Sequence, residues 1–239
     1  MSSSPSSNSA GHGRLGGHIL VDALVEEGVD LVFGVPGESY LAVIDGLQER
    51  NGIRTVMCRQ EGGAAMMADA YGKLTGRPGV CMVTRGPGAT NASAGVHVAF
   101  QDSTPMVLLV GQVARWMVER EAFQEIDYRR MFGQMAKWVA QIDDAARIPE
   151  YISRAFHTAV SGRPGPVVLA LPEDMLMDYA DVAGIAPYVP VEPHPGQQQM
   201  ADFRSMLDKA ERPIMIVGGG GWDRQACERI EQFAVANGV

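Results

Sequence analysis

The feature that most constrains the fold is a series of six short apolar runs, each separated from the next by a helical segment or a long crossover. The runs occupy residues 31–33, 55–58, 79–84, 105–110, 137–140 and 165–171. They are apolar throughout, which is typical of strands covered by helices on both faces. The pattern predicts an α/β fold: a doubly wound, mostly parallel six-stranded sheet with helices on both faces.

The stretch at residues 55–71 joins the second apolar run to a long segment rich in glycine and alanine. It predicts a buried strand followed by a helix that begins near Glu61, with Met66 and Met67 as core filler. Glu61 therefore stands where a strand ends, and open α/β sheets bind their ligands at that edge. The helix dipole alone favours an acid there by about 0.3–1 kcal/mol. The small neighbours favour a second interpretation, because they let a large group approach a carboxylate suited to proton chemistry.

Two further glycine-rich loops are expected at the same edge of the sheet, at residues 35–38 and 84–91. Together the three loops predict a crevice that takes a flat organic ring against the backbone. The loop at residues 84–91 contains only the first half of a GxGxxG motif, with Asn91 in place of the third glycine. A dinucleotide site is therefore a weak interpretation. We expect Ser39 to cap the helix that follows the first loop.

Charge and cysteine content exclude several classes of protein. The 239 residues carry a net charge of −8 without a basic cluster, which argues against binding to nucleic acid or to a membrane surface. The longest apolar runs are too short to cross a membrane. Cys58, Cys81 and Cys227 form no CxxC pair, which indicates a reducing compartment, and we expect a cytoplasmic location. No cluster of histidine, cysteine and acidic residues predicts a metal site.

The two ends of the chain differ in composition from the α/β part. We assign residues 1–16 to a disordered tail, because the segment is rich in serine and glycine and lacks the apolar stretch of a secretory signal. Residues 17–179 form the predicted α/β domain, and residues 180–199, with four prolines, form a linker. Residues 200–239 predict a helix, a strand at 213–217 and a second helix, the truncated start of a second α/β domain. One strand cannot form a sheet, so the remainder of that domain is expected outside the chain.

A series of motifs becomes recognisable when it is taken in order along the chain. The motifs are GVPG at residues 34–37, Glu61 followed by Ala64, Ala68 and Tyr71, TRGPGATN at 84–91, QDSTP at 101–105, GQV at 111–113, AFQE at 122–125 and SGRPGP at 161–166. In this order they resemble the N-terminal, pyrimidine-binding domain of thiamine diphosphate enzymes, in particular the acetolactate synthase group. The resemblance covers residues 17–177 and extends into the start of the family's middle domain.

The resemblance implies a role for Glu61. In the family, the matching glutamate hydrogen-bonds N1′ of the cofactor's aminopyrimidine and favours the tautomer that takes the proton from thiazolium C2. The activated cofactor then attacks a small 2-oxo acid, commonly pyruvate, which loses CO₂ while the ring system acts as the electron sink. A pocket of glycine and alanine is expected to raise the proton affinity of such a carboxyl.

The resemblance also implies a cofactor-binding set around the aminopyrimidine. Together with Glu61, the matching positions are Pro36, Gly37, Glu38, Thr84, Pro87 and Asn91. Gln124 matches a glutamine at the reaction centre, so Glu61 and Gln124 are the two residues implied as catalytic. Plainer alternatives are that the two prolines only shape turns, that Asn91 caps a helix and that Gln124 is an exposed loop amide.

The sequence departs from the family pattern in two ways. Glu38 and Arg85 stand where acetolactate synthases usually carry small residues, and a bulky acid narrows the space for the substrate. The family's diphosphate and Mg²⁺ motif, GDG followed by two asparagines, does not occur, so the metal ligands are expected outside this chain. FAD binding by the middle domain, as in some relatives, stays open.

The resemblance implies that this domain faces the diphosphate domain of a second subunit. We therefore expect a homo-oligomer, at least a dimer, with a shared active site that takes a small 2-oxo acid, and a chain that is inactive by itself. Two alternatives are the pyrimidine-binding subunit of a split 2-oxo-acid decarboxylase and a non-catalytic homologue. The linker and partial second domain argue against the first alternative, and Glu61 argues against the second.

Overall fold

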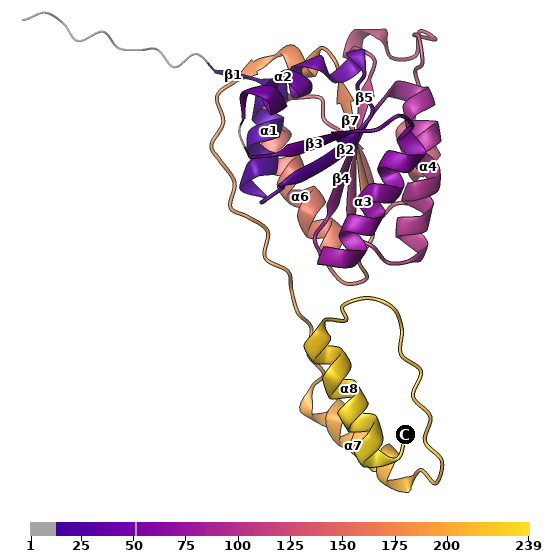
Figure 1. The fold of residues 1–239 in the computed structure, drawn as a ribbon. Helices are drawn as coiled ribbons and strands as arrows, with labels where there is room; N and C mark the ends of the chain where they lie inside the picture. Colours follow the sequence, from indigo (N-terminus) through magenta and orange to yellow (C-terminus); the bar gives the residue numbers. More distant parts are fainter. Residues whose placement is uncertain (1–12, 51) are drawn as a thin grey trace, which may run out of the picture. The chain divides into compact units, whose positions relative to one another are not determined.

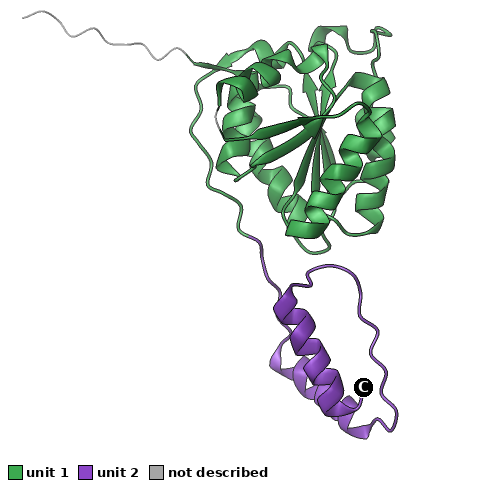
Figure 2. Cartoon of the chain, in the orientation of Figure 1, with its two compact units in different colours: residues 1–189 green, residues 190–239 purple. Residues whose placement is uncertain are grey.

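The computed structural model describes residues 13–50 and 52–239. The chain forms two compact units, residues 1–189 and residues 190–239 (Figure 2). The boundary between the units falls inside the segment that we predict as a linker. In the part of the chain that the structure describes, no helix has both the length and the apolar character needed to cross a membrane.

The first unit is built on a six-stranded sheet. Its strands are β2 (Leu31–Gly34), β3 (Arg54–Met57), β4 (Gly79–Thr84), β5 (Met106–Gln112), β6 (Trp138–Gln141) and β7 (Pro166–Pro172). Their order is β3-β2-β4-β5-β7-β6, and every neighbouring pair is parallel (Figure 1). This confirms the predicted sheet. The chain reverses its direction of travel across the sheet between β2 and β4, which is where ligand crevices form in such folds.

Helices cover both faces of the sheet, as predicted. They are α1 (Gly16–Glu26), α2 (Leu41–Glu49), α3 (Glu61–Thr75), α4 (Arg85–Gln101), α5 (Tyr128–Phe132) and α6 (Ile148–Val160), with 3₁₀ turns at Glu38–Tyr40, Arg115–Met117, Ala145–Arg147 and Met175–Met177. Figure 1 shows α1 and α6 on one face and α3 and α4 on the other. Side chains of β5 alternate between the two cores, with Val107 and Leu109 in one and Leu108 and Val110 in the other. This alternation is the period of two expected for a strand.

The start of the domain corrects the predicted tail. Residues 1–12 lie outside the described residues, but Arg14–Leu15 form a short strand, β1, and Gly16 begins α1. Strand β1 pairs antiparallel with β8 (Tyr179–Ala180). Glycine at position 16 permits this arrangement, since a Cβ there would lie 2.6 Å from the carbonyl oxygen of Met175. The ordered domain therefore begins a few residues before the predicted boundary.

The segment after β8 lies against the first unit. It has no helix or strand between residues 181 and 196, yet the carboxylates of Glu26 and Glu27 accept the backbone N–H groups of Ile185 and Tyr188, each at 2.8 Å. The ring of Tyr188 also packs on Phe156, with centroids 5.8 Å apart. Burial raises the pKa of Glu27, which is 3% exposed. The first half of the predicted linker is thus a docked segment.

The second unit contains α7 (Gln197–Lys209) and α8 (Arg224–Asn237), close to the two predicted helices. The Asp223 carboxylate caps α8 by accepting the N–H of Ala226 at 2.6 Å. The predicted strand at residues 213–217 is wrong: this segment has no regular structure, and Ile214 and Ile216 are 85% and 90% exposed. A strand needs a neighbour to satisfy its backbone groups, and the described part of this unit provides none.

Candidate active site

Glu61 is the first residue of α3 and follows the carboxyl end of β3 after a short connection, residues 58–60, as the sequence predicts. Gln60 caps the helix, because its side-chain oxygen accepts the N–H of Gly63 at 2.8 Å. The Glu61 side chain is half-buried, and its Oε2 accepts a hydrogen bond from Nδ2 of Asn91 at 2.9 Å. The structure therefore brings together two residues of the predicted site.

The segment at residues 84–91 corrects our expectation of a loop. Thr84 is the residue before α4, and the helix begins at Arg85, so Gly86, Pro87 and Gly88 form its first turn. Proline is tolerated there because the first N–H groups of a helix lack intrahelical partners. Asn91 lies inside the helix and points to Glu61, so it is not a cap.

The pairing of Asn91 with Glu61 depends on close contact between α3 and α4. Gly95 of α4 faces α3, and a Cβ at that position would lie 2.5 Å from the Cβ of Ala65. The small residues that the sequence shows on both helices thus allow their backbones to approach. This packing places the second turn of α4 beside the first turn of α3.

The first turn of α4 also borders the other oxygen of the Glu61 carboxylate, Oε1. A Cβ at Gly88 would lie 3.7 Å from Oε1 of Glu61 and 3.3 Å from Cβ of Val83. Among the described residues, hydrogen bonding to the carboxylate is confined to Oε2, and Oε1 has no donor. A polar atom of a flat ligand can therefore take that place without displacing a protein partner.

Two buried groups near Glu61 stay in their neutral forms. Burial, with smaller contributions from Cys81 and Glu61, raises the pKa of Tyr40. Burial likewise raises the pKa of Cys81, with contributions from Cys58 and Glu61. Tyr40 donates its hydroxyl hydrogen to the carbonyl of Val35. Neither group is therefore suited to act as a nucleophile at neutral pH.

The loop after β2 is fixed against the end of β4. A Cβ at Gly37 would lie 2.3 Å from Cβ of Thr84, so only glycine fits. Ser39 is buried and its hydroxyl is 2.7 Å from the Thr84 hydroxyl. Our prediction of a Ser39 cap is wrong, because α2 begins after Tyr40 without a side-chain cap. Gly37 and Thr84 thus lie together, whereas Pro36 and Pro87 are exposed.

The backbone of Gln124 contacts the start of α4. Its carbonyl oxygen accepts the N–H of Gly86 at 2.9 Å, and its φ of +66° is unusual for a residue other than glycine. The Glu125 carboxylate closes the same loop by accepting the N–H groups of Glu119 and Ala122. The structure thus brings Gln124 to the helix that carries Asn91. Its side-chain role stays a prediction.

Arg85 and Glu173 form a feature that the sequence analysis missed. Arg85 Nη1 lies 3.1 Å from Oε1 of Glu38, and Nη2 lies 2.5 Å from Oε2 of Glu173. Glu38, Arg85 and Glu173 follow β2, β4 and β7 respectively. The sequence did contain a signal for this cluster. Two acidic residues and one arginine each follow a predicted strand, and the carboxyl ends of parallel strands meet at one edge of the sheet.

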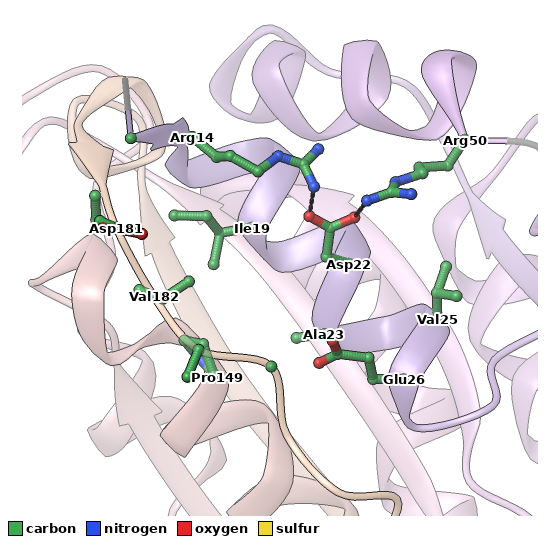
Figure 3. A pocket seen from close by; sticks show the side chains of 14 residues that line it. Arg14, Ile19, Asp22, Ala23, Val25, Glu26, Arg50, Pro149, Asp181 and Val182 are labelled. Atoms are coloured by element: carbon green, nitrogen blue, oxygen red, sulfur yellow. Dashed lines mark ion pairs between the residues drawn. The ribbon is translucent and has the colours of Figure 1, made fainter. Parts of the chain in front are cut away.

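Of two hollows in the first unit, one lies apart from the predicted site residues and the other includes one of them. One, of about 370 Å³, is lined by α1, Arg50 and the segment after β8, and includes none of the predicted site residues (Figure 3). In it Asp22 forms ion pairs with both Arg14 and Arg50. The other, of about 260 Å³, is largely apolar and is lined by Pro36, Tyr40 and neighbouring residues. Of these two hollows, the second therefore adjoins the loop that we expect at the pyrimidine edge.

One group of side chains could in principle hold a metal ion, within the residues that the structure describes. His18 Nε2 lies 2.8 Å from Oδ2 of Asp45, and Nδ1 lies 3.2 Å from Oε2 of Glu49. The two ring nitrogens therefore meet different carboxylates, and the group links α1 to α2. It contains none of the predicted site residues.

Comparison with known proteins decides the family. Residues 14–131 match the family described as "Thiamine pyrophosphate enzyme, N-terminal TPP binding domain". This part of the chain belongs to that family. The match runs from β1 into α5 and includes Glu61, Asn91 and the glycines at positions 37 and 88. It confirms the resemblance to thiamine diphosphate enzymes and the fold that this resemblance implies.

Several curated proteins are similar in sequence to most of this chain. The chain is 37% identical over 227 residues to the acetolactate synthase large subunit of Haemophilus influenzae, covering 92% of this chain and 39% of the relative. It is 38% identical over 232 residues to the acetolactate synthase isozyme 3 large subunit of Escherichia coli, covering 90% and 39%. For the large subunit of Corynebacterium glutamicum the identity is 36% over 232 residues, covering 94% and 36%. The chain spans about two fifths of the length of these relatives.

Proposed function

We propose that this chain is the pyrimidine-binding part of a thiamine diphosphate-dependent 2-oxo-acid decarboxylase and carboligase of the acetolactate synthase type. One observation carries the proposal. The Glu61 carboxylate stands at the carboxyl edge of the sheet, with one oxygen held by Asn91 and the other facing the backbone of Gly88. A carboxylate fixed in this way suits hydrogen bonding to a ring nitrogen.

The residues around Glu61 fit the aminopyrimidine of the cofactor. When bound, thiamine diphosphate supplies the electron sink for loss of CO₂ from the 2-oxo acid. Glu61 Oε1 would hold a proton against the ring nitrogen, while Nδ2 of Asn91 fixes Oε2. Gly37 and Thr84, which lie against each other across the ends of β2 and β4, would form an edge beside the ring.

We further propose that the chain functions in a homo-oligomer whose active site is shared between subunits. Exposed apolar side chains near the site support this: Met66 and Met67 are 40% and 38% exposed, and Phe123 is 71% exposed. The prediction that the two methionines fill the core is therefore wrong. Exposed apolar side chains mark an interaction surface when they form a contiguous patch, which is what we expect of these residues. The partner would supply the ligands for Mg²⁺ and the diphosphate. A cytoplasmic location agrees with the free cysteines Cys58, Cys81 and Cys227.

The test is Glu61→Gln in the complete enzyme, with exchange of the thiazolium C2 proton measured by NMR. Because the variant keeps the size of the side chain but cannot hold the proton, we expect exchange to slow by about 10²–10⁴-fold. Glu192→Gln, at an exposed position of the second unit, is the matched control for loss of one negative charge. Exchange at the wild-type rate in Glu61→Gln would contradict the assignment.

A further inference from the structure

Arg85 is a buried cation in an unfavourable place. Its side chain is only 9% exposed, and it is the first residue of α4, where the helix dipole favours anions. Its φ is +26°, which residues other than glycine rarely adopt. Burial of a charge is also costly unless it is paired. A residue that breaks three local preferences at once is expected where function requires it.

Two carboxylates compensate the Arg85 guanidinium. Nη1 lies 3.1 Å from Oε1 of Glu38 and Nη2 lies 2.5 Å from Oε2 of Glu173. The third nitrogen of the guanidinium, Nε, is buried and has no partner among the described residues. The planar fork of arginine fixes both acids, which a flexible lysine would not do. Three loops at the carboxyl edge of the sheet are thereby joined by one side chain.

Glu38, unlike Arg85, is exposed to solvent. Its side chain is 69% exposed, against 9% for Arg85. Its backbone is held on both sides, since Gly37 touches Thr84 and the Ser39 hydroxyl bonds to the Thr84 hydroxyl. An exposed glutamate normally samples many rotamers. Here both ends of the side chain are fixed, so Glu38 presents a negative charge in one direction.

We propose that Arg85 is a positioning residue that holds Glu38 as a specificity-determining carboxylate at the carboxyl edge of the sheet, the edge that also carries Glu61. The inference rests on the proposed function and adds the substrate class to it. A fixed negative charge disfavours 2-oxo acids whose side chain carries a second carboxylate, and leaves neutral side chains unaffected. The three charges of Glu38, Arg85 and Glu173 sum to −1, so the cluster repels anions although it contains a cation.

The test measures the ratio of kcat/KM for pyruvate to kcat/KM for 2-oxoglutarate in the complete enzyme. Glu38→Gln removes the fixed charge, so the ratio falls by roughly five- to tenfold. Arg85→Lys keeps the net charge of −1 but does not hold both carboxylates, so Glu38 is released and the ratio falls as well. The double variant Glu38→Gln/Arg85→Lys lowers the ratio no further than Glu38→Gln, because Arg85 acts through Glu38. Glu173→Gln is the matched control and changes the ratio less than Glu38→Gln, because Glu173 is half as exposed.

A second readout does not depend on turnover. In the chain itself, ¹⁵N NMR of the arginine side chains reports rotation about the Nε–Cζ bond, which exchanges Nη1 with Nη2. The fixed guanidinium of Arg85 gives separate Nη1 and Nη2 signals, and their exchange becomes faster in Glu38→Gln, where Glu173 alone holds the fork. Merged signals in the wild-type chain overturn the positioning role, whether or not Arg85→Lys folds.

The outcomes separate the two proposals. A wild-type enzyme that converts no 2-oxo acid refutes the proposed function, and this inference with it. Normal turnover with a ratio that does not respond to Glu38→Gln, or that responds to Glu38→Gln but not to Arg85→Lys, refutes this inference alone. The second result would mean that Glu38 acts without being positioned by Arg85.

Discussion

At the scale of single residues, glycines set how closely the loops of the site approach each other. Gly37 is one such case, because a Cβ at this position would lie 2.3 Å from the Cβ of Thr84, a distance that no side chain allows. Gly88 and Gly95 keep the helix that carries Asn91 close to Glu61. The site thus depends on the absence of side chains as much as on the polar groups.

Gly37→Ala is expected to destabilise the domain by about 1–3 kcal/mol, because the new methyl group overlaps Thr84 and the loop must move. Thermal unfolding measures the loss, and titration with thiamine diphosphate in the complete enzyme measures the weaker binding that we expect to accompany it. Gly63→Ala is the matched control. Its new Cβ would have its nearest neighbour at 4.0 Å, and it lies inside α3, so it should stabilise by up to about 1 kcal/mol. Equal stability of the two variants would contradict the steric argument.

The buried carboxyl group of Glu27 makes the stability of the domain depend on pH. Burial raises its pKa above the ordinary value of 4.5, so the folded state holds the proton more tightly than the unfolded state. Stability from this group is therefore present at low pH and is lost as the pH rises through the folded pKa. Glu27→Gln should raise the unfolding temperature at pH 7.5 by a few degrees, about 2–4 °C per kcal/mol, and the gain should vanish near pH 4.5.

Differential scanning fluorimetry between pH 4.5 and 8 measures the Glu27 effect. Gln at this position keeps an oxygen that accepts the N–H of Tyr188. Glu192→Gln, on exposed chain, controls for the loss of one charge. A gain for Glu27→Gln that is the same at every pH would show that burial of the ionised form is not its cause.

At the scale of elements, the sequence predicts the sheet well because each strand is a continuous apolar run between turn signals. The errors have physical reasons. The Gly-Pro-Gly segment before Asn91 is typical of a loop, yet proline fits the first turn of α4 and the two glycines face other backbone and side chains. The run at residues 213–217 has the composition of a strand, but a strand forms only beside another. The link from Arg85 to Glu173 joins residues 88 positions apart, which no local pattern reveals.

At the scale of the whole molecule, the segment at residues 181–189 belongs physically to the α/β domain. Its contacts with Glu26, Glu27 and Phe156 lie within the first unit. A chain that ends at residue 189 should therefore fold as a stable domain. A chain that ends at residue 180 should lose about 1–3 kcal/mol, because Tyr188 no longer covers Phe156 and Glu27 loses its donor.

Thermal unfolding of the two shortened chains checks this expectation. Proteolysis of the 239-residue chain provides the matched control, because exposed positions after residue 189 should be cut before those that precede it. Equal unfolding temperatures for the chains that end at 180 and 189 would mean that the docked segment contributes nothing.

The pairing of β1 with β8 sets the first and last strands of the domain side by side, running in opposite directions. A short peptide in place of the docked segment after β8 could therefore connect the two strands into a closed ring. The ring would lose the contacts of Tyr188, but it could be reopened elsewhere without breaking the sheet. The turn at Gly162 offers such a place, because a methyl group added there would have no heavy atom within 4 Å. The same geometry lets the domain be inserted as a module into a loop of a host protein.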